Sequence, residues 1–319
     1  MSKVLPIITP DSFDYRQYMT DTDPEAKVLP ADVWRDELAD IVENGNQIHG
    51  AHLPWAKTHD NIRFRGGEVT LWQGTNGSGK SQLLGMACMG FAAQGERVCI
   101  ASFEMMPKAT LYRMMKQGAQ NGNPPAQFVD QFIDWITGRM WIYNQMGQCS
   151  PKVLAAAIRY CATKLKIRHI VIDSLMRVVA GEDNYNAQKD FVGLLCCLAH
   201  DHNVHIHLVH HCRKPADDSV IPNKFDSKGS GAISDQVDQV LTVWRNKKKQ
   251  REVEQSMSKT GTISPELEGK PDALLVCDKN RHGEWEGKVS LWYHAPSLQY
   301  TQDSRCMPLD MMRASATAR

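Results

Sequence analysis

The feature that most constrains this chain is a glycine-rich segment, Gly74–Ser81, which reads Gly-Thr-Asn-Gly-Ser-Gly-Lys-Ser. Loops of the form G-x-x-x-x-G-K-[ST] curl around phosphate and point successive backbone N–H groups at its oxygens. In such loops the lysine reaches the β- and γ-phosphates and the last hydroxyl binds Mg²⁺. We therefore predict a site for a nucleoside triphosphate with Mg²⁺. Its predicted residues are Gly74, Thr75, Asn76, Gly77, Ser78, Gly79, Lys80 and Ser81.

The residues on either side of this loop predict a strand before it and a helix after it. Residues 68–73 form a short, mostly apolar run, and residues 82–91 have the composition of a helix. This order places bound phosphates at a helix N-terminus, where unpaired N–H groups and the helix dipole favour anions. The context disfavours the alternative, an ordinary glycine-rich turn.

Composition limits the class of protein. The chain has 319 residues, of which 42% are hydrophobic, enough for one large domain or two modest ones. The net charge of +1 gives no global attraction to polyanions, so any contact with nucleic acid has to come from a local patch. The nine cysteines contain no C-x-x-C pair, which disfavours a zinc knuckle. With no membrane span and no signal sequence, we expect a soluble protein of the cytoplasm or another reducing compartment.

From residue 68 onward, strand-like and helix-like runs alternate, which is typical of an α/β fold with a mostly parallel central sheet and helices on both faces. The last two expected strands have no helix between them and predict a C-terminal β-hairpin. The region 246–271 is charged and irregular, and we expect a surface excursion there. The expected strands are residues 68–73, 97–103, 139–143, 169–173, 204–210, 238–244, 273–278 and 288–293.

We divide the chain into an N-terminal arm with a linker helix (residues 1–47), a main domain (residues 48–302) and a flexible tail (residues 303–319). Within the arm, residues 31–45 predict an amphipathic helix that ends at a glycine. Its apolar face could pack on its own domain or on a neighbouring subunit, and the pattern leaves both open. That face comprises Trp34, Leu38, Ile41 and Val42.

Two acidic residues follow predicted strands of this sheet. Asp173 ends the apolar strand 169–173, as the Mg²⁺ ligand of phosphate-loop enzymes does. Glu104 ends the strand that follows the loop, where a carboxylate beside the γ-phosphate can orient and deprotonate water. From spacing alone, a solvated acid opening the next helix explains Glu104 as well.

Four histidines, His205, His207, His210 and His211, lie on one predicted strand and raise the question of a metal site. A zinc site would need a fourth ligand and carboxylates that orient the histidine rings, and neither is evident. We therefore favour core or strand-end histidines. His211, at the carboxyl edge of the sheet, could hydrogen-bond the γ-phosphate.

Residues 226–232 form a polar, glycine-rich loop with Lys214, Lys224 and Lys228 nearby. Such a loop can wrap a sugar-phosphate backbone with N–H groups and a few cations. A plain solvated loop would have the same composition.

Residues 278–283 end a strand and open a turn. Lys279 and Arg281 are two residues apart, so both side chains can point the same way. Paired cations suit a γ-phosphate, but two surface cations on a turn are equally ordinary.

Taken in order, these segments resemble the motifs of the RecA-type motor domain of DnaB-family ring helicases, closest to Twinkle and to the helicase half of phage helicase-primases. The resemblance extends from about residue 48 to residue 300. It implies a RecA-like P-loop fold for the main domain, ATP as the nucleotide and Mg²⁺ as the metal.

The resemblance gives each motif a role. Residues 102–104 match the segment whose glutamate is the catalytic base, and residues 211–215 match the segment that carries a polar γ-phosphate switch. Residues 226–233 match the loop that grips single-stranded DNA, and residues 279–283 match a finger that enters the ATP site of the next subunit. The implied catalytic residues are Glu104, Lys80, His211, Arg281 and Lys279, the metal ligands Ser81 and Asp173, and the DNA-binding residues Lys214, Lys224, Lys228, Gly229, Ser230 and Gly231.

By the same resemblance, Arg245 and Tyr293 fall where the phage enzymes sandwich the nucleotide base, which cation–π and stacking chemistry makes plausible. The chain also departs from the family. No primase or zinc-binding domain precedes the motor, and the N-terminal section is too short for a helical collar, so residues 31–45 are the only candidate for the linker helix. The residue after Lys228 is glycine, where cellular members carry an acid.

The motifs and the resemblance together predict an ATP-dependent DNA helicase. We expect a hexameric ring with a trans-acting finger that moves on single-stranded DNA at a replication fork, in a bacterial or phage-infected cell, with a primase and a polymerase as candidate partners. Two alternatives stay open: a RecA- or RadA-like strand-exchange ATPase that forms filaments, and a regulatory P-loop ATPase that does not unwind DNA. The Lys279/Arg281 pair and residues 102–104 favour the helicase over the filament.

Overall fold

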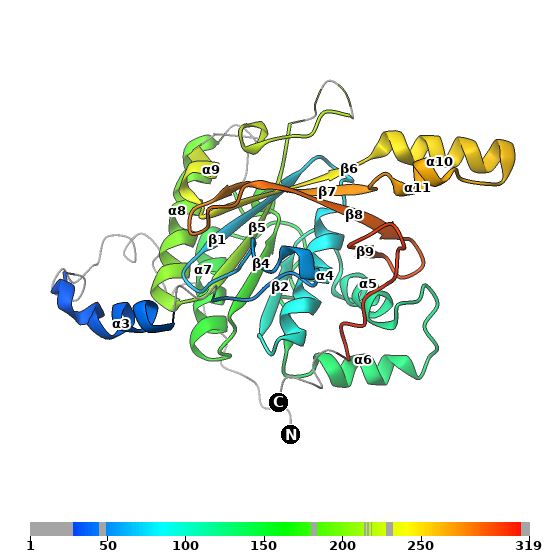
Figure 1. The fold of residues 1–319 in the computed structure, drawn as a ribbon. Helices are drawn as coiled ribbons and strands as arrows, with labels where there is room; N and C mark the ends of the chain where they lie inside the picture. Colours follow the sequence, from blue (N-terminus) through cyan, green and yellow to red (C-terminus); the bar gives the residue numbers. More distant parts are fainter. Residues whose placement is uncertain are drawn as a thin grey trace.

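The structure is a computed structural model, and it describes residues 28–44, 49–179, 184–213, 215, 217, 219–227 and 232–313. Its centre is a nine-stranded sheet in the order β3-β2-β4-β5-β1-β6-β7-β8-β9 (Figure 1). The strands are β1 (Val69–Gly74), β2 (Val98–Ser102), β3 (Met140–Ile142), β4 (His169–Asp173), β5 (His205–His211), β6 (Gln239–Arg245), β7 (Ala273–Asn280), β8 (Gly287–His294) and β9 (Gln299–Thr301).

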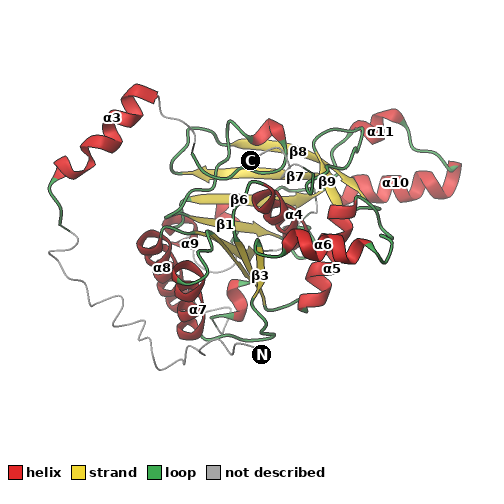
Figure 2. Ribbon diagram, turned by 90° about the horizontal axis from the view of Figure 1, so that it is seen from below, coloured by secondary structure: helices red, strands yellow, loops and turns green. Residues whose placement is uncertain are grey.

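The helices lie around and beside this sheet (Figures 1 and 2). None that the structure describes is long and apolar enough to cross a bilayer. The α-helices are α3 (Arg35–Asn44), α4 (Lys80–Ala93), α5 (Pro107–Ala119), α6 (Phe128–Ile136), α7 (Pro151–Thr163), α8 (Tyr185–His202), α9 (Ala232–Gln236), α10 (Lys247–Thr260) and α11 (Pro265–Gly269), and the short 3₁₀ turns are η2 (Ala31–Trp34), η3 (Ala56–Thr58), η4 (Leu175–Arg177) and η5 (Lys224–Asp226).

The sheet is parallel from β3 to β6 and antiparallel from β6 onward. This arrangement confirms the predicted mostly parallel α/β sheet with a C-terminal hairpin, β7–β8. Parallel pairing brings the carboxyl ends of β1, β2, β4 and β5 to one edge, and the loops that follow these ends form the candidate site. The three-residue strand β9 was not predicted, because so short a segment carries no clear alternation.

Two hydrophobic cores lie on the two faces of the sheet. Alternate strand residues such as Leu71 and Ile172 pack against α7 and α8 on one face. Their neighbours Trp72 and Val171 pack against α4, α5 and α6 on the other. Both faces of the central strands are therefore buried, which explains their near-continuous apolar sequences. Burying one such large apolar side chain contributes about 1.5–3 kcal/mol.

The charged region between residues 246 and 271 is helical, so its prediction as an irregular segment is wrong. Asn246 caps α10 by accepting a hydrogen bond from the Lys249 N–H at 3.0 Å, and Gly261 ends the helix with a φ of 69°. Ser264 caps α11 in the same way, and Pro265 occupies its first turn. The predominantly polar sequence of α10 hid the helix, because little apolar periodicity remains to detect. Figure 1 shows α10 and α11 projecting together beyond the strands.

Residues 303–313 pack against the domain, so the predicted flexible tail is wrong for this stretch. The Leu309 N–H donates to Oε1 of Gln299 at 2.7 Å, and Nε2 of Gln299 donates to the Leu309 carbonyl at 2.9 Å. Met311 is buried in the same core as α4. The sequence concealed this packing, because the contacts come from distant elements. Residues 314–319 lie outside the described residues.

The predicted amphipathic helix at residues 31–45 is present as η2 and α3, which end at Asn44. It lies apart from the sheet in both views (Figures 1 and 2). Trp34, Leu38 and Val42 remain 44%, 59% and 83% exposed, so the helix's own domain does not cover this face. This observation favours the neighbouring-subunit alternative. The rest of the predicted arm, residues 1–27, and the Ile41 side chain lie outside the described residues.

Candidate nucleotide-binding site

The glycine-rich loop joins the end of β1 to the start of α4, as predicted. Gly79 is the residue before α4 and has a φ of 93°, a left-handed conformation that side chains other than glycine rarely adopt. A Cβ at Gly79 would also collide with the hydroxyl of Tyr300. Gly77 has a φ of 73°. The loop therefore needs these glycines, and it leaves the N-terminal N–H groups of α4 available to an anion.

Lys80 is buried at the first position of α4. Its Nζ donates to the carbonyl oxygens of Gly74 and Thr75, both at 2.9 Å. Burial lowers the pKa of Lys80, and Cys212, Asp173 and Glu104 partly oppose this effect. The ammonium group is thus held at the loop, where a phosphate would replace solvation that it lacks.

Ser81 and Asp173 meet across the site. The Ser81 hydroxyl donates to Oδ2 of Asp173 at 2.6 Å. Asp173 ends β4 and is buried, and burial raises the pKa of its carboxyl group, while the hydrogen bond from Ser81 opposes this rise. A hydroxyl and a carboxylate are the hard oxygen ligands that Mg²⁺ prefers, so the pair fits the predicted metal ion.

Glu104 lies two residues beyond the end of β2 and points toward the same site. Its Oε1 accepts from Nε of Arg177 at 3.2 Å and from the Ser174 hydroxyl at 3.3 Å. The next helix, α5, begins at Pro107 with Met106 as its N-cap, so Glu104 does not cap it. The geometry therefore favours the site interpretation of Glu104 over that of a helix-opening acid.

An open cavity of about 580 Å³ lies beside the loop and brings together five of the predicted residues. His211, the last residue of β5, reaches this cavity because it pairs in register with Gly74 at the end of β1. The predicted residues that line the cavity are Lys80, Ser81, Glu104, Asp173 and His211.

Two arginines of this cavity, Arg113 and Arg177, were missed by sequence reasoning. Arg177 lies four residues after Asp173 in η4, where its ion pair with Glu104 forms. Its proximity to the metal-binding strand was a usable signal. Arg113 lies in the middle of α5 and reaches the site only because α5 packs on α4, which no local pattern indicates.

The other histidines of β5 are core residues, as favoured. Nδ1 of His205 lies 2.7 Å from the carbonyl of Arg65, and Nδ1 of His207 accepts from the indole of Trp72 at 3.2 Å. Nε2 of His207 lies 3.2 Å from Nδ1 of His169. Burial lowers the pKa of His205 to about 3 and the pKa values of His169 and His207 well below the ordinary value. These rings are neutral and hydrogen-bonded within the core.

A smaller cavity of about 130 Å³ adjoins the first, and both are lined by Gln82 and Arg245. Arg245 ends β6 and Tyr293 lies near the end of β8, so the structure brings the two predicted base-binding residues to one place. Tyr300 lies beside them, with its ring 5.4 Å from that of Tyr293. The position of this cavity beside the phosphate loop suits a nucleoside.

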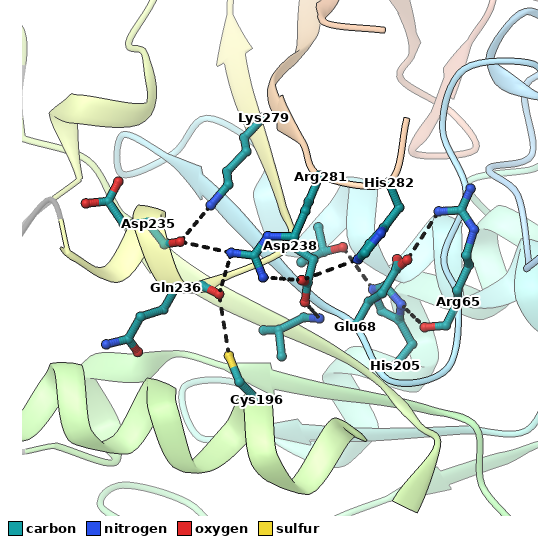
Figure 3. A network of polar contacts seen from close by, with 12 residues as sticks. Arg65, Glu68, Cys196, His205, Asp235, Gln236, Asp238, Lys279, Arg281 and His282 are labelled. Atoms are coloured by element: carbon teal, nitrogen blue, oxygen red, sulfur yellow. Dashed lines mark hydrogen bonds and ion pairs between the residues drawn. The ribbon is translucent and has the colours of Figure 1, made fainter. Parts of the chain in front are cut away.

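Lys279 and Arg281 lie at the opposite edge of the sheet. Because β7 runs antiparallel to β6, its end, Asn280, pairs with Gln239 at the start of β6, far from the loop end of β1. Figure 3 shows Lys279 donating to the Asp235 carbonyl at 2.8 Å and Arg281 donating to Asp238 at 2.8 Å. Within the described part of the chain, neither side chain lines the cavity beside Lys80.

Of the predicted DNA-binding residues, only Lys224 is described, and it lies in η5. Asn223 and Asp226 cap this turn reciprocally, with hydrogen bonds of 2.9 Å and 2.8 Å. The turn exposes Phe225, an aromatic residue that sequence reasoning missed. Its place between lysines at the start of the glycine-rich loop was the available signal. Lys214, Lys228, Gly229, Ser230 and Gly231 lie outside the described residues.

The fold and the loop geometry together define a P-loop nucleotide-binding protein with a RecA-like core. Residues 60–217 match the family model described as an AAA domain. Among solved structures, the ATPase domain of a phage helicase is similar, with a TM-score of 0.70 and 16% identity over 86% of this chain and 98% of that one. A DnaB-like replicative helicase, solved with its interactions with primase, is similar with a TM-score of 0.66 and 16% identity over 86% of this chain and 67% of that one. The chain has the fold of DnaB-family ATPase domains, which confirms the predicted likeness and fold class.

Proposed function

We propose that this protein is an ATP-dependent DNA helicase that works as a hexameric ring around one strand at a replication fork. The separation of two sets of charged residues within one chain carries this proposal. Lys80, Ser81, Asp173 and Glu104 lie at the carboxyl edge of the parallel strands, whereas the Lys279/Arg281 pair lies at the other edge. A complete hydrolysis site then requires two subunits in head-to-tail contact, an arrangement that closes into a ring.

At the carboxyl edge, the loop N–H groups and Lys80 bind the triphosphate. Ser81 and Asp173 hold Mg²⁺, which when bound neutralises charge on the β- and γ-phosphates. Glu104 orients the attacking water and accepts its proton, and the hydrogen bonds from Arg177 and Ser174 fix the direction of its carboxylate.

The neighbouring subunit supplies Arg281 and Lys279, which stabilise the charge on the transferred phosphoryl group. Such a finger can increase the rate by about 10³–10⁵. The exposed apolar face of α3 supports this assembly, because Trp34, Leu38 and Val42 would be covered by an adjacent subunit. His211 would report the state of the γ-phosphate to the glycine-rich loop.

The DNA strand would lie against residues 226–231 and the turn that precedes them. Lys224 offers a cation to the backbone and Phe225 offers a ring on which a base can stack. Six copies of such a modest surface converge in a ring, which compensates for a net charge of only +1. At a fork, a primase and a polymerase would be the partners of this activity.

Unwinding of a forked duplex with a labelled strand tests the proposal, with Glu104→Gln as the inactive control that still binds nucleotide. We expect ATP-dependent strand separation by the wild type and none by the variant. Electron microscopy with a non-hydrolysable ATP analogue and single-stranded DNA should show closed rings. Open filaments would support a strand-exchange ATPase, and hydrolysis without strand separation would support a regulatory ATPase.

A further inference from the structure

Helix α10 reaches the small cavity beside the phosphate loop. Asn246, which precedes the helix, and Gln250 and Val253 on its first two turns line the same cavity as Arg245 and Tyr293. Residues three or four apart lie on one face of a helix, so Gln250 and Val253 face the cavity together. The segment that connects β6 to β7 is therefore part of the wall of this cavity.

A buried ammonium group fixes the position of α10. Lys249 is 5% exposed, and its Nζ lies 2.8 Å from Oδ1 of Asp272. The same Nζ donates to the carbonyl oxygen of Lys270 at 2.6 Å, just before β7. Leaving a buried charge unpaired is costly, so these contacts hold the helix against the sheet.

The anchor continues directly to the aromatic floor of the cavity. Oδ2 of Asp272 accepts the backbone N–H of Tyr293 at 2.9 Å, and the Asp272 carbonyl accepts from the Asn246 N–H at 2.8 Å. One carboxylate thus joins Lys249 on α10 to the strand that carries the ring. The other ion pairs of the segment, such as Lys270 with Glu252 at 3.8 Å, are long and exposed and contribute little.

We propose that α10 is the specificity wall of the nucleoside pocket, and that Gln250 and Val253 contact the nucleobase of the bound triphosphate. Val253 supplies apolar contact. The Gln250 amide carries donors and an acceptor, and its Nε2 now donates to Glu254 at 2.9 Å, one turn along the helix. A side chain of this kind discriminates between bases by the edge groups that it can satisfy. The proposal rests on the nucleotide site of the proposed function but not on DNA unwinding.

Calorimetric binding of Mg²⁺ complexes tests this inference on the full chain. The probes are non-hydrolysable analogues of ATP, GTP, CTP and UTP, and inorganic tripolyphosphate, which has no nucleoside. We expect Gln250→Ala and Val253→Ala each to weaken the preferred nucleotide by roughly 3- to 10-fold and to narrow its preference over the others, as for one lost contact. Tripolyphosphate binding should not change. Lys248→Ala, an exposed neighbour on the same helix, is the matched control.

Lys249→Met gives a second reading, because it removes the anchor without changing a residue that lines the cavity. We expect it to reduce nucleotide preference as the wall residues do, with circular dichroism showing a folded protein. If Gln250→Ala and Val253→Ala bind all four analogues as the wild type does, the specificity wall is wrong. If the wild type binds no nucleotide, this inference and the nucleotide site both fail. If it binds nucleotide selectively without unwinding DNA, only the helicase proposal fails.

Discussion

Nη1 of Arg281 donates to Oδ1 of Asp238 at 2.8 Å, while Oδ2 of the same carboxylate accepts the Val69 N–H at 2.9 Å (Figure 3). Val69 begins β1, the strand that carries the phosphate loop at its other end. Arg281 also donates to the Asp235 carbonyl in α9 at 3.1 Å. Its side chain is therefore held by α9, which follows the proposed DNA-binding loop, and by the central strand of the nucleotide site.

Asp238→Asn should weaken this hold on Arg281 and retain an oxygen for the Val69 N–H. We expect ATP hydrolysis by the assembled protein to fall roughly 3- to 10-fold, a modest loss because the Arg281 side chain is partly exposed. Nucleotide affinity should stay unchanged, since this carboxylate lies far from the loop. Steady-state hydrolysis and calorimetric binding measure the two effects. Asp235→Asn is the control, because Asp235 holds the finger through its carbonyl alone; equal losses in both variants would contradict the role of Asp238.

A mixture of Glu104→Gln and Arg281→Ala subunits should regain ATP hydrolysis that neither variant has alone. Each variant should lose about 10³-fold or more of its activity. In mixed assemblies, some interfaces combine an intact Glu104 with an intact Arg281 from the neighbour. Hydrolysis is measured as a function of mixing ratio. Full activity of Arg281→Ala by itself would show that the finger does not act between subunits.

Asp173→Asn should raise the stability of the nucleotide-free protein at neutral pH. Burial raises the pKa of Asp173, and a carboxyl group with a raised pKa is destabilising once it ionises, so this cost is absent at low pH and is felt as the pH rises through its pKa. The asparagine amide oxygen can still accept from Ser81. Thermal unfolding at pH 7 should show a higher midpoint for the variant.

The same variant should lose the stabilisation that Mg²⁺ with an ATP analogue gives the wild type. A gain in stability together with this loss is expected where a site is built for a ligand. An unchanged response to Mg²⁺ would remove Asp173 from the metal site. Asp134→Asn, an exposed carboxylate on α6, serves as the control.

His205→Gln should reduce the sensitivity of the fold to acid. Burial lowers the pKa of His205 to about 3, so the neutral ring is stable in the fold, and protonation favours the unfolded chain as the pH falls below about 6.5. Between pH 6.5 and pH 5 this residue alone should cost the wild type about 2 kcal/mol of unfolding free energy. Urea unfolding at several pH values measures the slope. His200→Gln, on an exposed ring, should keep the slope of the wild type.

The sequence predicted the local parts of the site because their geometry is set within a few residues. The loop at residues 74–81 needs only its glycines and the strand and helix beside it, and Asp173 follows a strand whose apolar run is unmistakable. Parallel pairing then brings the strand ends together, so Glu104 and His211 reach the same cavity. These positions follow from topology, which alternation of strands and helices already indicates.

The errors lie where little apolar periodicity was available. Helix α10 is so polar that its sequence predicts an irregular excursion, although Asn246 and Gly261 mark its two ends. The stretch 303–313 resembles a tail because Met311 and the Gln299–Leu309 hydrogen bonds depend on partners elsewhere in the chain.

What the sequence determined by itself is the phosphate loop and the order of the charged motifs along an α/β chain, because both depend on short-range spacing. Only the tertiary structure decided that Lys279 and Arg281 lie at the opposite edge of the sheet from Lys80, and that α10 closes the nucleoside cavity. Both results depend on β7 reversing against β6 and on the buried pairing of Lys249 with Asp272. Such contacts join segments whose separation in sequence carries no periodic signal, so their energies appear only once the chain has folded.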